Sequence, residues 1–266
     1  MSTAAAIHAA LTDAIDRRAP VAVATVVRGE PLGAKLLVLG DDTLGGLGDP
    51  GLDRRAADDA RELLAAEKSE TRTYETAAGP VEVFLESFPP PPVLLVFGGV
   101  HVAQPLAHFA KRLGFDVIVS DAREKLANPE RFPDADRIIV GWPDEVLEQV
   151  EILPNWYVAI LSHDPKFDEP ALLGTLASPA RYIGAIGSRK TSVDRRRRLE
   201  EAGATPEQMA RIRGPIGLDI GARTPEEMAV SILGEIIALR NDRQGGRLTA
   251  SSGNIRGERE TVGAPA

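Results

Sequence analysis

The sequence predicts an α/β protein in which a Rossmann-like parallel-sheet domain follows a smaller α+β domain. Its length of 266 residues fits one large domain or two small ones. Four consecutive prolines at 89–92 can join neither a helix nor a central strand, and their stiff, extended conformation suits a linker. After this linker, strand and helix patterns alternate, which is typical of a parallel sheet covered on both faces. We therefore predict an N-terminal domain over 1–88, a Rossmann-like domain over 93–240 and a disordered tail over 241–266.

The N-terminal part combines two predicted helices with short strands. Apolar residues recur at four-residue steps in the segment 4–17, which favours a helix. A glycine-rich stretch over 44–51 leads into a second helix, which begins at Asp49-Pro50 because an acidic cap precedes a proline there, and which runs to about Glu67. The predicted strands are Val21–Val27, Lys35–Leu39, Thr71–Tyr74 and Val81–Glu86.

The part after the linker contains five predicted strands with helical stretches between most of them. A final helix is marked by Thr224 as a cap hydroxyl, Pro225 at the first helical position and Glu227 at the third, and it continues to about Arg240. The predicted strands are Val93–Phe97, Asp116–Ser120, Arg137–Val140, Tyr157–Leu161 and Tyr182–Ile186.

The composition excludes several classes of function. The chain has no cysteine, which removes disulfides, thiolate-held metal sites and a thiol nucleophile, and with only four histidines we predict no metal site. A net charge of −8 disfavours nucleic-acid binding. No apolar segment approaches the about 18 residues of a membrane span, and the N-terminus lacks the basic region of a targeting peptide. We therefore expect a soluble cytoplasmic protein that binds neither nucleic acid nor membranes.

The first candidate site is the turn where the first strand after the linker runs into Gly98-Gly99. The backbone N–H groups of the helix that follows suit a phosphate. Asp121 ends the next strand 23 residues after Gly98, a spacing at which an acid often binds a ribose hydroxyl. Val100 stands where a dinucleotide fingerprint has its second glycine, so a side chain would obstruct a pyrophosphate. The alternative is that the glycines only form the turn and that His101, at its mouth, only caps or packs.

Polar residues follow two further predicted strands, at the strand ends where ligands of open α/β sheets bind. His163, with Asp164 or Asp168, could transfer a proton or hold a polar ligand; the alternative is a loop in which Asp164 caps the next helix.

At the following strand end, Gly187 and Ser188 precede Arg189 and Lys190. Free N–H groups at a helix start together with two cations suit an anion. The alternative is a capped turn with two solvated cations.

Two other segments are ambiguous. The run Arg195–Arg198 is balanced by Glu200 and Glu201, and we expect it to be a solvated helix face. The loop Gly214–Gly221 places several glycines around Asp219, which is either a functional acid or a side chain that stabilises the turn.

Together these segments resemble the XdhC/CoxF (XdhC/CoxI) family of accessory proteins, which mature molybdenum hydroxylases such as xanthine dehydrogenase. The resemblance covers roughly residues 5–240, and its most specific blocks are the last two. The matching segments are 28–38, 45–52, 98–102, 114–123, 162–164, 182–190 and 215–232.

The resemblance implies an XdhC/CoxI-like N-terminal domain and a chaperone that binds molybdenum cofactor, as molybdopterin or its dinucleotide form. This chaperone would aid insertion of the cofactor into the apo-subunit of a xanthine or CO dehydrogenase type hydroxylase. A cofactor sulfurase is a further partner to expect, and a homodimer stays open. The alternative function is an NAD(P)-dependent oxidoreductase that uses the Rossmann domain. No catalytic residue is assigned, and the predicted cofactor contacts are Gly98, Gly99, His101, Asp121, His163, Gly187, Ser188, Arg189, Lys190 and Asp219.

Two positions depart from the family pattern. The family usually has Gly-Ala-Gly-His where this chain has Gly98-Gly-Val100-His101, which disfavours ordinary dinucleotide binding. Many members have a cysteine followed by Leu-Glu where this chain has Gly51-Leu-Asp53. Any contact with the metal made by that thiolate is therefore absent from this chain.

Overall fold

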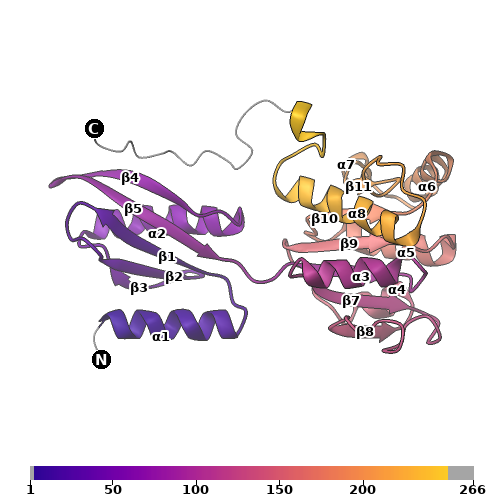
Figure 1. The fold of residues 1–266 in the computed structure, drawn as a ribbon, viewed down its shortest axis with the longest axis horizontal. Helices are drawn as coiled ribbons and strands as arrows, with labels where there is room; N and C mark the ends of the chain where they lie inside the picture. The colour runs from indigo at the N-terminus through magenta and orange to yellow at the C-terminus, as the bar shows by residue number, and fades with distance from the viewer. Residues whose placement is uncertain (1–2, 251–266) are drawn as a thin grey trace. The chain divides into compact units, whose positions relative to one another are not determined.

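The computed structural model describes residues 3–250 and divides the chain into two compact units, with the boundary between Pro91 and Pro92 (Figure 1). This boundary falls inside the proline run. Residues 89–92 lie between two strands and have no regular secondary structure themselves.

The N-terminal unit is an antiparallel sheet with one helix on each face (Figure 1). Its elements are α1 (Thr3–Asp16), β1 (Val21–Arg28), β2 (Lys35–Leu39), β3 (Asp42–Gly46), α2 (Pro50–Ala65), β4 (Glu70–Thr76) and β5 (Gly79–Phe88). The strand order is β3-β2-β1-β5-β4, and each neighbouring pair is antiparallel. Because successive strand residues point to opposite faces, Val21 and Val23 pack against α1, whereas Ala22 and Ala24 pack against α2.

Strand β3 lies in the glycine-rich stretch, where no strand was predicted. Gly45 has a φ of +95°, and a Cβ there would overlap the carbonyl oxygen of Lys35 on β2. Glycine therefore permits a close approach of two strands that a side chain would prevent. The predicted start of α2 is confirmed, because the Asp49 carboxylate accepts a hydrogen bond from the Leu52 N–H at 2.7 Å.

The C-terminal unit contains a six-stranded parallel sheet, which confirms the predicted fold class. Its order, β11-β10-β9-β6-β7-β8, contains the usual Rossmann arrangement of two half-sheets that diverge from the first strand. The elements are β6 (Val93–Phe97), α3 (Ala103–Arg112), β7 (Asp116–Asp121), β8 (Arg137–Val140), α4 (Pro143–Leu147), β9 (Trp156–Ile160), α5 (Pro165–Leu176), β10 (Tyr182–Ala185), α6 (Arg189–Glu201), α7 (Pro206–Ala210), β11 (Ile212–Arg213) and α8 (Pro225–Arg240).

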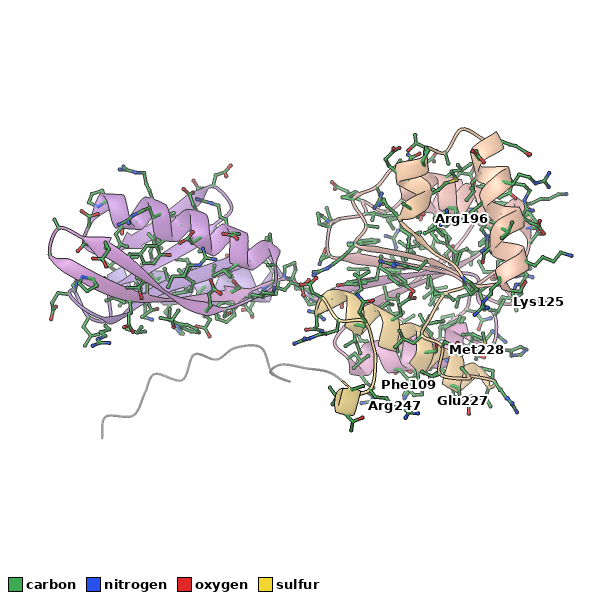
Figure 2. All side chains as sticks on the ribbon, turned by 90° about the horizontal axis from the view of Figure 1, so that it is seen from above. Phe109, Lys125, Arg196, Glu227, Met228 and Arg247 are labelled. Atoms are coloured by element: carbon green, nitrogen blue, oxygen red, sulfur yellow. The ribbon has the colours of Figure 1, made fainter. Side chains whose placement is uncertain are left out.

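Helices cover both faces of this sheet. Helices α3 and α8 pack on one face, where Phe109 and Met228 contact the same apolar core (Figure 2). Helices α4, α5, α6 and α7 contribute to the core on the other face, with Phe97 and Val158 of the central strands. The central strands are therefore apolar on both sides, as parallel strands require.

Three features of the C-terminal unit go beyond the sequence prediction. Helix α7 and the two-residue strand β11 were not predicted, since both are too short for a periodic pattern. The predicted tail contains a 3₁₀ helix at Leu248–Ala250, and its remainder, 251–266, lies outside the described residues. Between residues 3 and 250, no helix is long and apolar enough to cross a membrane.

The arginine run on α6 is not a uniformly solvated face, and that expectation was wrong. Arg195 is 3% exposed and donates to Asp168 at 3.3 Å and to the Ile186 carbonyl at 2.7 Å. Arg198 pairs with Glu169, and of the four arginines Arg196 and Arg197 have the expected exposed position. Burial raises the pKa of Asp168 to about 6, although Arg195 acts in the opposite direction.

Replacing Arg195 should destabilise the C-terminal unit in a pH-dependent way. Arg195→Met leaves the buried Asp168 carboxylate without its cation, which costs about 3–5 kcal/mol of unfolding free energy at pH 8. The raised pKa of Asp168 already makes wild-type stability fall as pH rises from about 4 to 6. Without Arg195 this pKa rises further, so the variant continues to lose stability above pH 6. Urea denaturation followed by circular dichroism at pH 5 and pH 8 measures the difference.

Arg197→Met is the matched control, because Arg197 is on the same helix with an exposed side chain paired to Glu201 at 3.7 Å. Its effect should stay below about 1 kcal/mol at both pH values. An equal loss in the two variants would contradict the role given to the buried pair. The double variant Asp168→Leu/Arg195→Met should recover part of the loss, because it leaves no buried charge.

Candidate functional site

The predicted site residues lie mainly at the carboxyl ends of the parallel strands. The strand order reverses at β6, which lies between β9 and β7, and ligands of such sheets bind beside this point. A Cβ on Gly98 would lie 3.0 Å from the Ser162 backbone nitrogen. The structure therefore brings together two motifs that are 64 residues apart in the sequence.

The glycine turn after β6 is fixed by contacts on both sides of Gly99. The Gly99 N–H donates to the Asp121 carboxylate at 2.9 Å, and its carbonyl accepts from the Arg131 side chain at 3.1 Å. A Cβ on Gly99 would overlap the Leu126 carbonyl oxygen. Only glycine fits here without movement of the backbone.

Asp121 is buried, and both of its carboxylate oxygens are engaged. Besides the Gly99 N–H, it accepts three bonds from Arg123: Nε at 2.8 Å, Nη2 at 2.9 Å and the backbone N–H at 3.0 Å. Burial by itself would raise the pKa of Asp121, but these hydrogen bonds lower it below the ordinary value. Asp121 thus organises the turn and holds Arg123, whereas a ribose would have to compete with Arg123 for the same oxygens.

The start of α3 offers backbone donors for an anion. The cap position, Val102, has no side-chain hydrogen bond to the helix. Among the residues described, the N–H groups of His101 and Val102 have no hydrogen-bond partner, and the His101 side chain is exposed. The Val100 side chain packs partly against the core that includes α3 and α8, so this turn differs from a fingerprint with a bare glycine.

The loop after β9 combines a structural acid with an exposed histidine. Asp164 caps α5 by accepting from the Lys166 N–H at 3.0 Å, as the structural alternative predicted. His163 is exposed and forms no hydrogen bond with any other described residue. Its imidazole is therefore available to a ligand.

The loop after β10 is the most cationic of the strand ends. Ser188 caps α6 by accepting from the Thr191 N–H at 3.1 Å, and Gly187 has a φ of +146°. Arg189 and Lys190 are exposed, and neither forms an ion pair within residues 3–250. Two unpaired cations at a helix start are suited to a phosphate or carboxylate.

The loop around Asp219 connects β11 to α8 and contacts the end of β10. Its Ile216 N–H donates to the Ala185 carbonyl at 3.1 Å, and the Ser231 hydroxyl of α8 donates to the Leu218 carbonyl at 2.6 Å. The Asp219 side chain is exposed beside a small cavity of about 220 Å³. Asp219 accepts no capping bond in this loop, so the structure does not support the alternative role in turn stabilisation.

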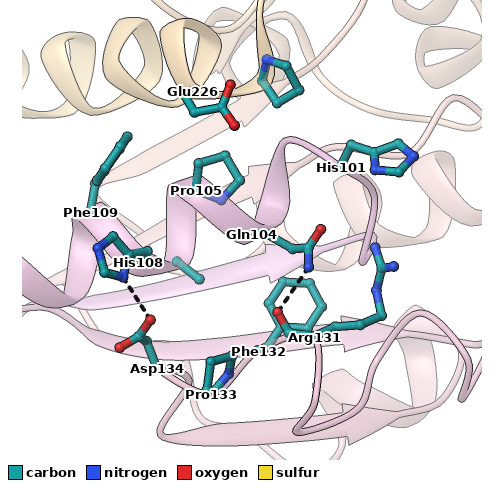
Figure 3. A pocket seen from close by; sticks show the side chains of 12 residues that line it. His101, Gln104, Pro105, His108, Phe109, Arg131, Phe132, Pro133, Asp134 and Glu226 are labelled. Carbon is teal, nitrogen blue, oxygen red and sulfur yellow. Dashed lines mark hydrogen bonds and ion pairs between the residues drawn. The ribbon is translucent and has the colours of Figure 1, made fainter.

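A cavity of the C-terminal unit lies beside α3, close to the glycine turn, and it is an open hollow (Figure 3). Its lining includes one predicted residue, His101, and two that the sequence patterns did not single out for binding, Arg131 and Glu226. Arg131 lies in an irregular segment with no motif. The sequence did contain a signal for Glu226. Thr224 and Glu227 form the capping box of α8, and Glu226 is the acid in the same turn that takes no part in it.

Gly51, which stands where the XdhC/CoxI pattern is expected to have a cysteine, lies in the N-terminal unit. Gly51 belongs to the first turn of α2, and a Cβ there would lie 3.0 Å from the Asp49 carboxylate. The neighbouring Asp53 accepts a bond from the Leu47 N–H at 2.7 Å. Asp53 therefore stabilises the chain before α2 through this hydrogen bond, and this role does not depend on a thiol at position 51.

Comparison with protein families gives matches in both units. A family model described as the XdhC Rossmann domain matches residues 94–236, and one described as the XdhC and CoxI family matches residues 14–75. The first match alone covers more than half of the chain.

Curated relatives are similar to between 59% and 69% of the chain. Uncharacterized protein YqeB of Escherichia coli K12 is 33% identical over 65% of this chain and 32% of its own length. A protein of Bacillus subtilis 168, described as a probable subunit of xanthine dehydrogenase, is 33% identical over 59% of this chain and 46% of its own. The molybdenum cofactor insertion chaperone PaoD of E. coli K12 is 26% identical over 69% of this chain and 50% of its own. The matches thus span about a third to a half of these relatives.

A solved structure supports the fold over nearly the whole chain. A crystal structure described as a xanthine dehydrogenase from Bacillus halodurans aligns with a TM-score of 0.54 and 22% identity. The alignment covers 94% of this chain and 98% of the other. At this identity the likeness establishes the architecture alone.

Replacing Gly99 should disturb the turn without touching an apolar core. Gly99→Ala places a Cβ against the Leu126 carbonyl, so we expect a loss of about 1–3 kcal/mol in unfolding free energy. Gly246→Ala is the control, because no atom lies within 4 Å of a Cβ at that position. Thermal and urea denaturation measure both variants. Equal stability of the two would refute the close approach at Gly99.

Proposed function

Since the chain belongs to the XdhC family, we propose that it is a chaperone that binds molybdenum cofactor and delivers it to a molybdenum hydroxylase of the xanthine dehydrogenase type. The observation that carries this proposal is the pair of family matches, one in each unit. A cofactor sulfurase as second partner, a homodimer and a cytoplasmic location stay predictions from the sequence.

The names of the relatives support the same function. One relative is named as a chaperone for molybdenum cofactor insertion, and another as a probable part of a xanthine dehydrogenase. The alignments cover 46% and 50% of these relatives' own lengths, so the transfer of their function is our inference.

The chemistry of the strand ends fits the anionic part of such a cargo. The cofactor is a pterin with a phosphate, extended by a nucleotide in some hydroxylases. Uncapped N–H groups at the start of α3 and the cations Arg189 and Lys190 at the start of α6 are donors of the kind that bind phosphate. The chain has no cysteine, so it would hold the cargo through pterin and phosphate contacts, without a protein sulfur on the metal.

The alternative, an NAD(P)-dependent oxidoreductase, has weaker support. The strand order suits a dinucleotide, but Asp121 has both oxygens engaged by Gly99 and Arg123. Val100 replaces the glycine that normally lets pyrophosphate approach. Titration with NAD and NADP distinguishes the two functions, since the oxidoreductase requires micromolar or tighter binding.

The proposal is tested by binding and transfer. The purified full chain is offered molybdenum cofactor under anaerobic conditions and then mixed with an apo-hydroxylase, whose activity reports the transfer. We expect Arg189→Ala/Lys190→Ala to weaken cofactor binding about tenfold, because two charge-assisted contacts with the anionic end are removed. Arg197→Ala is the matched control, since Arg197 is an exposed arginine on the same helix.

Failure of the wild-type chain to bind the cofactor, with no gain in hydroxylase activity, would overturn the proposed function. Equal affinity of the double variant and wild type would instead exclude the start of α6 as the anion contact. We expect the affinity of the wild-type chain for the cofactor to fall as the ionic strength rises. This loss of affinity should be smaller for the double variant.

A further inference from the structure

The hollow beside α3 has the volume of a site for a small organic ligand. Its volume of about 520 Å³ lies within the usual range of about 300–1,000 Å³ for such sites. It is bounded by α3, by the segment around Arg131 and by the start of α8 (Figure 3). It adjoins the glycine turn, because Arg131 bonds to the Gly99 carbonyl at 3.1 Å.

One side of the hollow carries an unused carboxylate. Glu226 is exposed, forms no ion pair with another described residue, and points toward Pro105 in Figure 3. Its neighbour Glu227 has a different task, since it accepts bonds from the N–H groups of Arg223 at 2.7 Å and Thr224 at 3.0 Å. These bonds lower the pKa of Glu227. Helix capping therefore engages Glu227, whereas Glu226, an acid in the first turn that also suits the helix dipole, keeps its carboxylate free of hydrogen bonds to the described residues.

The side toward the glycine turn carries cationic and N–H donors. His101 is exposed there, and the Arg131 guanidinium lies below it in Figure 3. The Arg131 Nε is buried and has no hydrogen-bond partner among the described residues. Together with the uncapped N–H groups at the start of α3, these groups favour an anion at this side.

The lining between the two sides combines apolar rings with polar side chains. Pro105 and Phe109 of α3 are both partly buried and line the hollow together with the buried Phe132. The polar residues Gln104, His108 and Asp134 line it as well, and His108 pairs with Asp134 at 2.8 Å. The apolar rings favour a planar ligand over a flexible chain. The ligand that fits is thus a planar heterocycle with N–H donors at one edge and a negative group at the other.

We propose that this hollow binds a phosphate-bearing 2-amino-4-oxopyrimidine ring, the group that pterins and guanine share. Glu226 accepts the ring N–H and the exocyclic amine, a pair of donors that a carboxylate oxygen pair matches. His101, Arg131 and the start of α3 face the phosphate. This assignment rests on the proposed function, which it deepens by giving the pterin a location on this chain.

The experiment is calorimetric titration of the full chain with three probes: 6-hydroxymethylpterin phosphate, guanosine monophosphate and adenosine monophosphate. Adenine lacks the paired donors, so its nucleotide should bind at least tenfold more weakly than the better of the other two. Glu226→Gln should weaken that probe at least tenfold, because an amide accepts only one of the two bonds. Glu227→Gln is the matched control and should stay within about twofold of wild type.

A second variant separates the two sides of the hollow. His101→Gln should weaken binding of the pterin phosphate severalfold and leave binding of unphosphorylated 6-hydroxymethylpterin unchanged. Glu226→Gln should weaken both. Preference for the pterin or for the guanine probe identifies the source of the ring.

Binding of the adenine nucleotide as tight as the others, unchanged binding in Glu226→Gln, or no binding of any probe would overturn the assignment. These results are distinguishable from failure of the proposed function. If Glu226→Gln transfers cofactor as well as wild type does, the assignment of this hollow is wrong and the proposed chaperone function stands. A chain that binds pterin phosphate through Glu226 but transfers no cofactor keeps the site and loses the chaperone function.

Discussion

The hydrogen bond from the Gly99 N–H to the buried Asp121 carboxylate is the contact on which the candidate site depends. It joins the turn after β6 to the end of β7, and the same carboxylate holds Arg123 in a bidentate pair. On the other side of the turn, Arg131 holds the Gly99 carbonyl. Because Gly99 also lies against the Leu126 backbone, the turn has little freedom to move, and α3 begins without a side-chain cap.

The hydrogen bonds of Asp121 affect how the strand, glycine turn and acid of this Rossmann domain should be interpreted. A strand, a glycine turn and an acid at the end of the next strand usually indicate a dinucleotide whose ribose binds the acid. Here the protein itself satisfies the acid, and a valine side chain belongs to the turn. The chain has the Rossmann sheet, but the Asp121 oxygens that would bind a ribose hydroxyl instead accept hydrogen bonds from Gly99 and Arg123. The engagement of Asp121 therefore weighs against a ribose at this strand end.

Much of the fold and part of the site were predictable because their signals are local. Apolar strands, the caps Asp49, Ser188 and Thr224, and the glycine turns each depend on residues within a few positions of one another. Strand β3 was missed because its glycines conceal a strand that needs them for a close approach to Lys35. The arginine run on α6 was misjudged because the partner of Arg195, Asp168, lies 27 residues away.

The sequence by itself determined the two-part architecture, the parallel sheet, the family resemblance and the strand ends where polar residues collect. The tertiary structure alone decided how those residues are used. It showed Asp121 paired to Arg123, Asp164 engaged in capping, and Arg189 and Lys190 without an ion-pair partner between residues 3 and 250. It also brought Glu226 and Arg131 to the same hollow as His101. The physical reason is that propensity and capping act over a few residues, whereas burial, ion pairing and the shape of a cavity arise only when distant segments pack together.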